Sequence, residues 1–310
     1  MFRSSLLWLS ERQGLFEFVK SNHFARKMAS RFVAGETLDE AIAAAKELNA
    51  AGISASLDLL GESVTDIEEA EKFRDEVIRI LDRIAKEGVE ANVSVKPTQF
   101  GLDLGVDVCV ANMRRVLERA KELDIFVRMD MEGSPYTQPT LDLLYKELFP
   151  DFGKVTGVVI QSYMRRSKQD IADLVKLGAR VRLCKGAYAE PESVAFQQRE
   201  EVSKSYRDLA EEMLQHGAYP AMATHDEDII AHIVAFVKEK SIPPESFEFQ
   251  MLYGVRRDLQ NKLAKDGFNI RVYIPYGTEW YPYLMRRLAE RPANLIFMTA
   301  SVLKEAFGVS

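Results

Sequence analysis

Near its C-terminus the chain carries polar side chains with the types and the spacing of a clamp for a carboxylate. They are Tyr283, Arg286, Arg287 and Glu290, at positions i, i+3, i+4 and i+7, which share one face of a helix. Pro282 is well placed to begin this helix, and Pro292 disfavours helix at the residue before it. Two guanidinium forks beside a phenol ring would suit the carboxylate of a small amino acid. Such a face is also common on solvated helices, so the place of this helix in the fold decides between the two interpretations.

The composition is typical of a globular protein, with 310 residues of which 47% are hydrophobic and 28% charged. The net charge of -6 argues against nucleic acid as a partner and against a strongly basic membrane patch. The two cysteines, Cys109 and Cys184, have no metal-ligand spacing and suit a reducing cytosol. The first residues have too short an apolar core for a signal peptide, and no apolar run approaches the ~20 residues that span a bilayer. We therefore expect a cytoplasmic protein, soluble or peripheral at a membrane.

The elements that must position the clamp repeat one pattern, a short apolar or β-branched run followed by a helical stretch. The runs span residues 53–60, 91–98, 125–132, 155–163, 180–188, 219–226, 247–254 and 270–277. Strand and helix alternating eight times predict an α/β fold with a closed parallel barrel, the (β/α)8 or TIM barrel. Residues 1–50 are expected to form extra helices packed on the barrel, and residues 51–310 the catalytic barrel within one structural domain. An open doubly wound sheet is disfavoured, because no G-x-G-x-x-G or Walker glycine loop occurs.

Helix boundaries are marked by capping residues and by glycines. Thr37 with Glu40, and Thr65 with Glu68, have the spacing of capping boxes, and Ser167 begins a related signal. Glycines stand where helices should stop before the next strand, at Gly52, Gly88, Gly178, Gly217 and Gly267.

Polar residues gather late in the strand runs, where a barrel of this kind places its active site. They are Glu62, Lys96, Asp130, Glu132, Gln161, Arg182, Lys185, Thr224, His225, Asp226, Gln250 and Tyr273. Each could face solvent at the rim, but charges within an apolar run, such as Arg182, are costly to bury. Their convergence on one mouth indicates a large polar ligand.

These residues leave more than one chemistry open. Lys96 or Lys185 at a strand end could form a Schiff base, as in an aldolase or transaldolase-like enzyme. A metal hydrolase would need more histidine than the four present, and only His225 stands at a strand tip, so we expect no metal. A barrel that binds a flavin or an amino acid without catalysis is a further alternative.

Four blocks in order resemble the signature blocks of the proline dehydrogenase family, above all its monofunctional bacterial type. The blocks are residues 182–188, 223–225, 249–254 and 283–290, and the similarity runs from the first helix to about Asn294. The resemblance implies a distorted (β/α)8 barrel that holds FAD without a Rossmann motif, with a final helix over the barrel mouth. It also implies oxidation of L-proline to Δ1-pyrroline-5-carboxylate, with hydride transfer from C5 to FAD N5.

The resemblance assigns substrate roles to individual positions. Arg286 and Arg287 would grip the proline carboxylate with help from Lys96, while Glu290 orients the two arginines. The pyrrolidine ring would be walled by Tyr188, Leu252, Tyr273 and Tyr283. Glu62 would pair with Arg286 as a gate over the substrate. The residues expected to serve catalysis directly are Lys96, Asp130, Arg182, Tyr273, Arg286 and Arg287.

Cofactor roles are implied in the same way. Arg182 would donate near the flavin N5, Gln161 would approach the pyrimidine side, and Val159 would pack on the ring. The remaining FAD positions are Asp130, Lys185, Gly186, Ala187, Thr224, His225, Gln250, Arg287 and Glu290. Many relatives carry an aromatic residue at the position of Ala189 and Asn at that of Asp226, so contacts from these two side chains are not implied.

The resemblance also implies partners. A membrane quinone would reoxidise the flavin, which places the protein peripherally on the inner face of the cytoplasmic membrane. A separate pyrroline-5-carboxylate (glutamate semialdehyde) dehydrogenase would complete the conversion of proline to glutamate.

Overall fold

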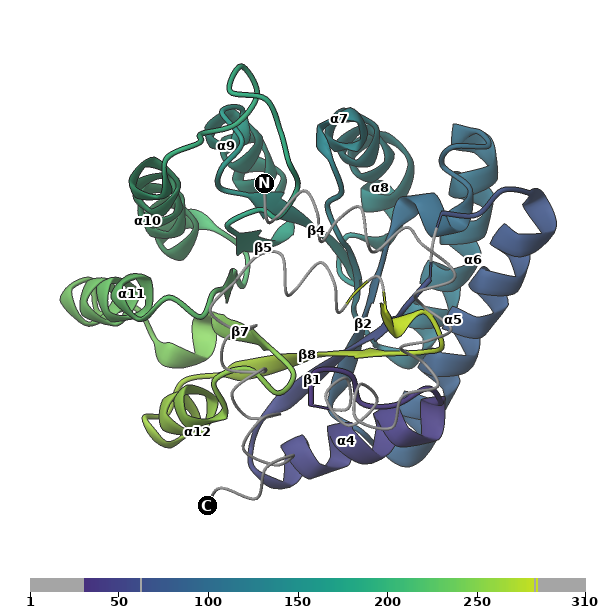
Figure 1. The fold of residues 1–310 in the computed structure, drawn as a ribbon, viewed down its shortest axis with the longest axis horizontal. Helices are drawn as coiled ribbons and strands as arrows, with labels where there is room; N and C mark the ends of the chain where they lie inside the picture. The colour runs from purple at the N-terminus through teal and green to yellow at the C-terminus, as the bar shows by residue number, and fades with distance from the viewer. Residues whose placement is uncertain (1–30, 62, 282, 284–310) are drawn as a thin grey trace, which may run out of the picture.

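Eight parallel strands close into a barrel in the computed structural model, which describes residues 31–61, 63–281 and 283 (Figure 1). The strands are β1 (Ser54–Leu59), β2 (Ala91–Val95), β3 (Val127–Met129), β4 (Thr156–Gln161), β5 (Arg180–Cys184), β6 (Ala221–Ala223), β7 (Glu248–Leu252) and β8 (Ile270–Tyr276). Each strand lies within one of the eight runs read from the sequence, so the predicted (β/α)8 fold is confirmed. The helix expected from Pro282 onward, except for Tyr283, and the one expected after Asn294 lie outside the described residues.

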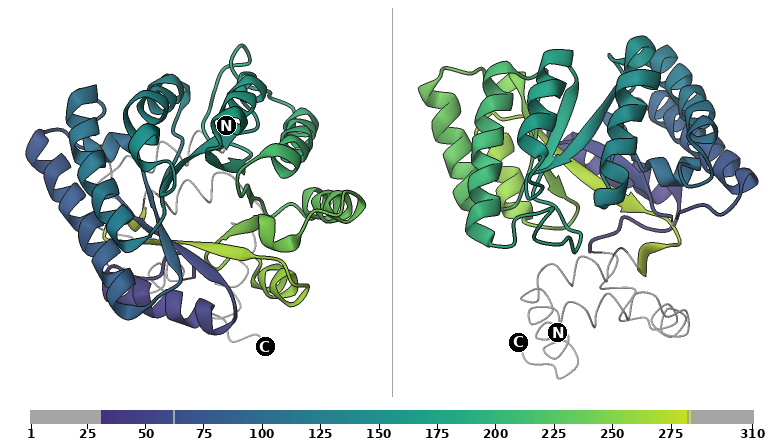
Figure 2. Two further views of the ribbon diagram at one scale, coloured as in Figure 1. Left: turned by 180° about the vertical axis from the view of Figure 1, so that it is seen from behind. Right: turned by 90° about the horizontal axis from the view of Figure 1, so that it is seen from above.

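Helices form an outer ring around the strands (Figures 1 and 2). They are α4 (Leu38–Ala50), α5 (Ile67–Glu87), α6 (Val106–Leu123), α7 (Ser134–Asp142), α8 (Phe149–Phe152), α9 (Ser167–Leu177), α10 (Arg199–His216), α11 (Glu227–Glu239) and α12 (Arg257–Lys265). Three short helical segments join them, namely η1 (Pro97–Phe100), the π-helical η2 (Leu143–Leu148) and η3 (Pro244–Ser246). In the ring, α4 stands between α12 and α5 and packs on both β1 and β8 (Figure 1). A helix that precedes the first strand therefore covers the seam where the barrel closes.

The predicted capping box of Thr37 and Glu40 is present at α4. The one predicted for Thr65 is wrong by one residue, because the side chain of Asp66 caps α5 by accepting from the Glu69 backbone. The backbone N–H of Thr65 donates to the Glu69 carboxylate instead.

The Ser167 signal is also shifted. Ser167 lies inside α9, and its hydroxyl donates to the carbonyl of Gln161. The predicted stops at Gly88 and Gly178 are confirmed, with φ of 63° and 75° that suit glycine.

The apolar core lies between the strands and the helices. Alternate strand residues such as Val93, Val127 and Val181 are buried there against the helices. The inside of the barrel is polar, because hydrogen bonds join side chains on strands that are not neighbours. Arg182 on β5 donates to Ser94 on β2, a bond that can only cross the interior. Polar and charged side chains therefore lie inside the barrel, and apolar side chains lie between the strands and the helices. The site is built from these interior polar side chains.

Candidate active site

Arg182 of β5 lies at the centre of the polar interior with only 6% of its side chain exposed. Its guanidinium directs three N–H groups at side chains of β2, β7 and the residue that follows β3. Nη1 donates to Asp130 Oδ1 over 2.7 Å, Nη2 donates to Ser94 Oγ over 3.0 Å, and Nε donates to Gln250 Oε1. Fixing the planar guanidinium at three points leaves it little freedom to rotate.

Asp130 follows β3 and joins Arg182 of β5 to Tyr273 of β8. Its second oxygen, Oδ2, accepts from the Tyr273 hydroxyl over 2.7 Å. The Tyr273 ring also faces the Arg182 guanidinium, with 5.2 Å between the guanidinium carbon and the ring centroid. Burial, and after it the charge of Asp130, raises the pKa of Tyr273 well above its ordinary value. The phenol therefore keeps its proton at neutral pH and acts as a donor.

Lys96, directly after β2, pairs with Asp58 of β1 over 3.2 Å. The side chain of Asp58 is only 2% exposed and that of Lys96 is 19% exposed. Burial alone would lower the pKa of Lys96, but the charges of Asp58 and Asp130 outweigh it, so the pKa is raised. Lys96 is therefore a cation at neutral pH and belongs to the same electrostatic cluster as Asp130.

The segment that follows β5 carries Lys185 and Gly186. The Lys185 ammonium pairs with Asp226 Oδ2 over 2.6 Å and lies 3.4 Å from the Ser203 hydroxyl. Gly186 has a φ of 105°, and a Cβ at this position would lie 2.2 Å from the Tyr163 ring. Only glycine fits here, so the backbone that leaves β5 can pass close to the Tyr163 ring.

Thr224 and His225 directly follow β6 and have partners inside the protein. The Thr224 hydroxyl accepts from the Asp226 backbone, and His225 Nε2 accepts from the Leu252 backbone N–H over 2.9 Å. An accepting Nε2 places the ring proton on Nδ1 in the neutral imidazole. Asp226 in turn caps α11 by accepting from Asp228.

On β4, Gln161 is 3% exposed and its amide donates to the carbonyl of Glu132 over 2.9 Å. Val159, one inward position below it on the same strand, is 4% exposed. Burial raises the pKa of Glu132 against the opposing hydrogen bond from Thr98. Val159 pairs in register with Arg182, and Gln161 lies two residues further toward the carboxyl end of β4.

The remaining predicted residues differ in exposure, and four of them are not among the described residues. Tyr188 is 39% exposed, whereas Tyr283 is 7% exposed. The proposed gate and most of the clamp, namely Glu62, Arg286, Arg287 and Glu290, lie outside the described residues. Their roles remain predictions.

Sequence reasoning missed two residues at the site, Asp58 and Ser94, and one residue below it, Glu248. Each lies on a predicted strand at the same alternation as a predicted site residue, Asp58 on β1 and Ser94 two residues before Lys96. Period-two counting back from the strand tips could have found them.

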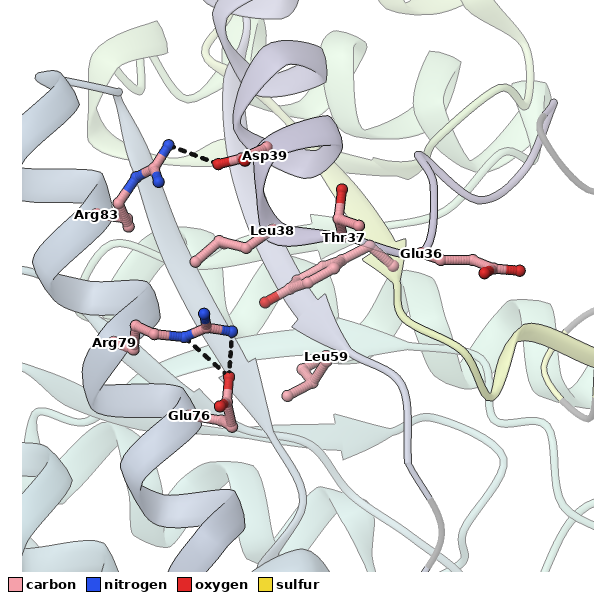
Figure 3. A pocket seen from close by; sticks show the side chains of 9 residues that line it. Glu36, Thr37, Leu38, Asp39, Leu59, Glu76, Arg79 and Arg83 are labelled. Carbon is pink, nitrogen blue, oxygen red and sulfur yellow. Dashed lines mark hydrogen bonds and ion pairs between the residues drawn. The ribbon is translucent and has the colours of Figure 1, made fainter.

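A separate cavity of about 390 Å³ lies outside the barrel, between α4 and α5. Figure 3 shows Arg79 and Arg83 of α5 lining it opposite Leu38 and Asp39 of α4. Both arginines are already paired, Arg83 with Asp39 over 2.8 Å and Arg79 with Glu76. The cavity holds none of the predicted site residues, so we do not assign the active site to it.

In the described ranges no group of three or more His, Cys, Asp or Glu side chains is arranged to hold a metal ion. The helices within those same ranges are also too short or too polar to cross a bilayer.

Comparison with known proteins places these features in a wider group. The family model described as "Proline dehydrogenase" matches residues 41–300. The chain is 40% identical over 305 residues to "Proline dehydrogenase 1" of Bacillus subtilis (strain 168), covering 98% of this chain and 100% of the relative. It is 39% identical over 308 residues to "Proline dehydrogenase" of Deinococcus radiodurans, covering 98% of each.

Among solved structures, the chain resembles proline utilization A (PutA) from Bdellovibrio bacteriovorus inactivated by N-propargylglycine. The TM-score is 0.81 at 27% identity, over 93% of this chain and 36% of that one.

Proposed function

This chain belongs to the proline dehydrogenase family, which is FAD-dependent, and we propose that it oxidises L-proline to Δ1-pyrroline-5-carboxylate in the first step of proline catabolism. When bound, FAD would supply the oxidising power by taking the C5 hydride of proline at N5. A membrane quinone then receives the electrons, and a separate pyrroline-5-carboxylate dehydrogenase uses the product.

The observation that carries this proposal is the cluster of Arg182 on β5, Asp130 directly after the carboxyl end of β3, and Tyr273 on β8. The carboxyl ends of the strands are where enzymes of this fold hold their substrates. The cluster is largely buried and its three side chains are joined by hydrogen bonds, so it can orient a reacting molecule with little reorganisation during the reaction.

Two cations of the site are each paired with a carboxylate. Lys96 is matched by Asp58, and Arg182 by Asp130. A substrate carboxylate therefore needs further positive charge at this mouth. We assign that charge to Arg286 and Arg287, whose forked donors match a carboxylate bidentately.

The donor set fits FAD. Lys185 is a partly buried cation beside the N-terminus of α11, an arrangement that suits a diphosphate. Gly186 lets the backbone pass close to the Tyr163 ring just after β5, and Thr224 and His225 directly follow the neighbouring strand β6. Arg182 and Gln161 would hold the polar edge of the flavin, and Val159 its face.

The residues favour loss of the proline nitrogen proton through electrostatics. An ammonium has no lone pair to support hydride loss from C5, and nearby cations disfavour that charged form. Tyr273 and Lys96 both hold their protons at neutral pH, since the pKa of each is raised. Neither is suited to act as the base, and we propose water at the mouth as the proton acceptor.

The Schiff-base alternative is disfavoured by the same observations. A lysine nucleophile needs a lowered pKa, whereas the pKa of Lys96 is raised by Asp58. Lys185 is engaged by Asp226 in an ion pair. Borohydride trapping of a substrate adduct would nevertheless support this alternative directly.

The decisive test is anaerobic addition of L-proline to purified protein loaded with FAD. Bleaching of the flavin absorbance is expected for the proposed enzyme. A flavin-binding barrel without catalysis would stay yellow, and protein that binds no flavin would exclude the proposal.

The clamp and the gate are tested separately. Arg286→Lys should raise the KM for proline on the order of tenfold or more, because lysine cannot grip a carboxylate bidentately. Wild-type kinetics in Arg286→Lys and Arg287→Lys would contradict the clamp. Unchanged KM and kcat in Glu62→Ala would contradict the gate.

A further inference from the structure

A continuous line of hydrogen-bonded side chains runs up the inside of the barrel, from Arg271 at the amino end of β8 to Arg182 below the mouth. We infer that Glu248 is a positioning residue for Arg182, acting through the amide of Gln250. The inference rests on the proposed function for its kinetic consequence, because Arg182 would stand beside the flavin. Glu248 itself lies below the site and touches none of the predicted substrate residues.

The contacts define the line. Glu248 and Gln250 are alternate residues of β7, and the Gln250 Nε2 group donates to Glu248 Oε1 over 2.5 Å. Gln250 Oε1 then accepts from Arg182 Nε. Glu248 is 1% exposed and Gln250 is 3% exposed, so water does not replace these partners.

The carboxylate of Glu248 decides which way the Gln250 amide points. A glutamine side chain can turn by 180° with almost no change of shape, exchanging its acceptor for its donor. Glu248 as a carboxylate can only accept, so the NH2 group of Gln250 must face it. The carbonyl oxygen must then face Arg182 Nε, which can only donate. A turned amide would set two donors against each other at Arg182.

Glu248 is held as a carboxylate by its neighbours. Burial would raise its pKa, but the charge and hydrogen bonds of Arg271 and the hydrogen bond from Gln250 outweigh burial, and the pKa is lowered. The Arg271 Nε group lies 3.1 Å from both Glu248 oxygens, and Tyr219 donates to Oε2 over 3.4 Å. The residue that sets the amide therefore stays ionised at every pH at which the protein would work.

Glu248→Gln tests the inference with little change in volume. The new amide can accept or donate, so Gln250 is no longer forced into one orientation. Arg182 should lose its fixed Nε acceptor for part of the time. We expect kcat for proline to fall on the order of tenfold while KM changes by less than about threefold, because Arg182 faces the flavin side of the reaction.

Tyr219→Phe is the matched control. It removes another hydrogen bond to the same carboxylate but leaves the carboxylate and the amide orientation intact. Its kcat and KM should remain those of the wild type. A loss of kcat equal to that of Glu248→Gln would show that Glu248 is merely structural.

Gln250→Leu supplies a second variant in case Glu248→Gln does not fold. It removes the oxygen that accepts from Arg182 Nε, and it should lower kcat at least as much as Glu248→Gln does. In the double variant the two losses should not add, since both act through one link. Wild-type kcat in either single variant, or additive losses, would overturn the inference.

A readout without flavin separates this inference from the proposed function. The Arg182 Nε–H resonance, assigned by its loss in Arg182→Lys, should shift in Glu248→Gln and stay in place in Tyr219→Phe. No shift in Glu248→Gln would refute the positioning role. Protein that is not bleached by proline but shows the shift would refute the proposed function alone.

Discussion

Tyr273 of β8 and Asp130, which follows β3, come from strands that are not neighbours, and the tyrosine hydroxyl donates to Asp130 Oδ2 over 2.7 Å. Because Oδ1 of the same carboxylate accepts from Arg182, Asp130 links two walls that share no backbone hydrogen bonds. The orientation of the Tyr273 ring and that of the guanidinium are therefore set by one side chain.

Tyr273→Phe should reduce kcat/KM for proline on the order of tenfold, because a hydrogen bond to a buried charged group contributes about 1.5–3 kcal/mol. Steady-state kinetics on FAD-loaded protein would measure the loss. Tyr276→Phe is the control on the same strand, since the described part of the chain supplies no hydrogen-bond partner for its hydroxyl. Equal losses in both variants would contradict the role of the Asp130 bond.

Lys96→Met should destabilise the fold by about 3–5 kcal/mol, because it leaves the buried carboxylate of Asp58 without its cation. Urea unfolding would measure the change, and Lys96→Met with Asp58→Asn should recover most of it. The exposed pair of Lys46 and Glu87 gives the comparison, since Lys46→Met should cost less than about 1 kcal/mol. If both single variants lose the same stability, the Lys96 pair is an ordinary surface pair.

The raised pKa of Lys96 gives this pair a pH window. Its contribution to stability should be complete below the unfolded-state pKa of about 10.4 and should fade as pH rises through the higher folded-state pKa.

Asp226→Asn should tighten FAD binding several-fold, by about 1 kcal/mol, because it releases Lys185 toward the diphosphate while asparagine still caps α11. Titration of flavin into apoprotein would measure it. Asp208→Asn, in the exposed pair with Lys204, should leave the affinity unchanged. Weaker binding in Asp226→Asn would mean that Asp226 holds Lys185 in place for the cofactor.

The stability contributed by the ion pair of Lys185 and Asp226 should be lost at low pH. Burial would raise the pKa of Asp226, but the hydrogen bond and charge of Lys185 outweigh it, so the pKa is lowered. The stability it contributes is present above the unfolded pKa of about 3.9 and is lost as pH falls through the folded pKa.

Cys109 should make the fold less stable in alkali. Burial, with the Glu132 charge second, raises the pKa of its thiol to about 12, whereas the unfolded thiol titrates near 9.0. Between these values the unfolded chain loses the proton first, so stability falls by up to about 1.4 kcal/mol per pH unit. Urea unfolding from pH 8 to 10 should show a shallower decline in Cys109→Ala than in wild type or Cys184→Ala. Identical slopes would contradict the prediction.

The sequence was sufficient to predict the barrel, because each strand had a short apolar run of its own with polar residues toward its end. The sequence could not show which polar side chains of different strands pair with one another. Lys96 and Asp58 are 38 positions apart, and their pairing depends on the register between β1 and β2. The cap at Asp66 was also missed, because Thr65 and Asp66 are both good capping residues and only the path of the chain selects one.

The joining of β1 to β8 has a consequence for how the protein folds. Six residue pairs, from Ser54 with Arg271 to Leu59 with Tyr276, form this seam, and Arg271 reaches the Ala55 carbonyl across 216 positions of sequence. Contacts this distant are slow to form, because the intervening chain must be ordered first. During synthesis Asp130 and Arg182 can emerge and begin to assemble well before Tyr273 exists. The protein should therefore become able to bind its ligands and to react only at the end of folding, in one late step that coincides with closure of the barrel.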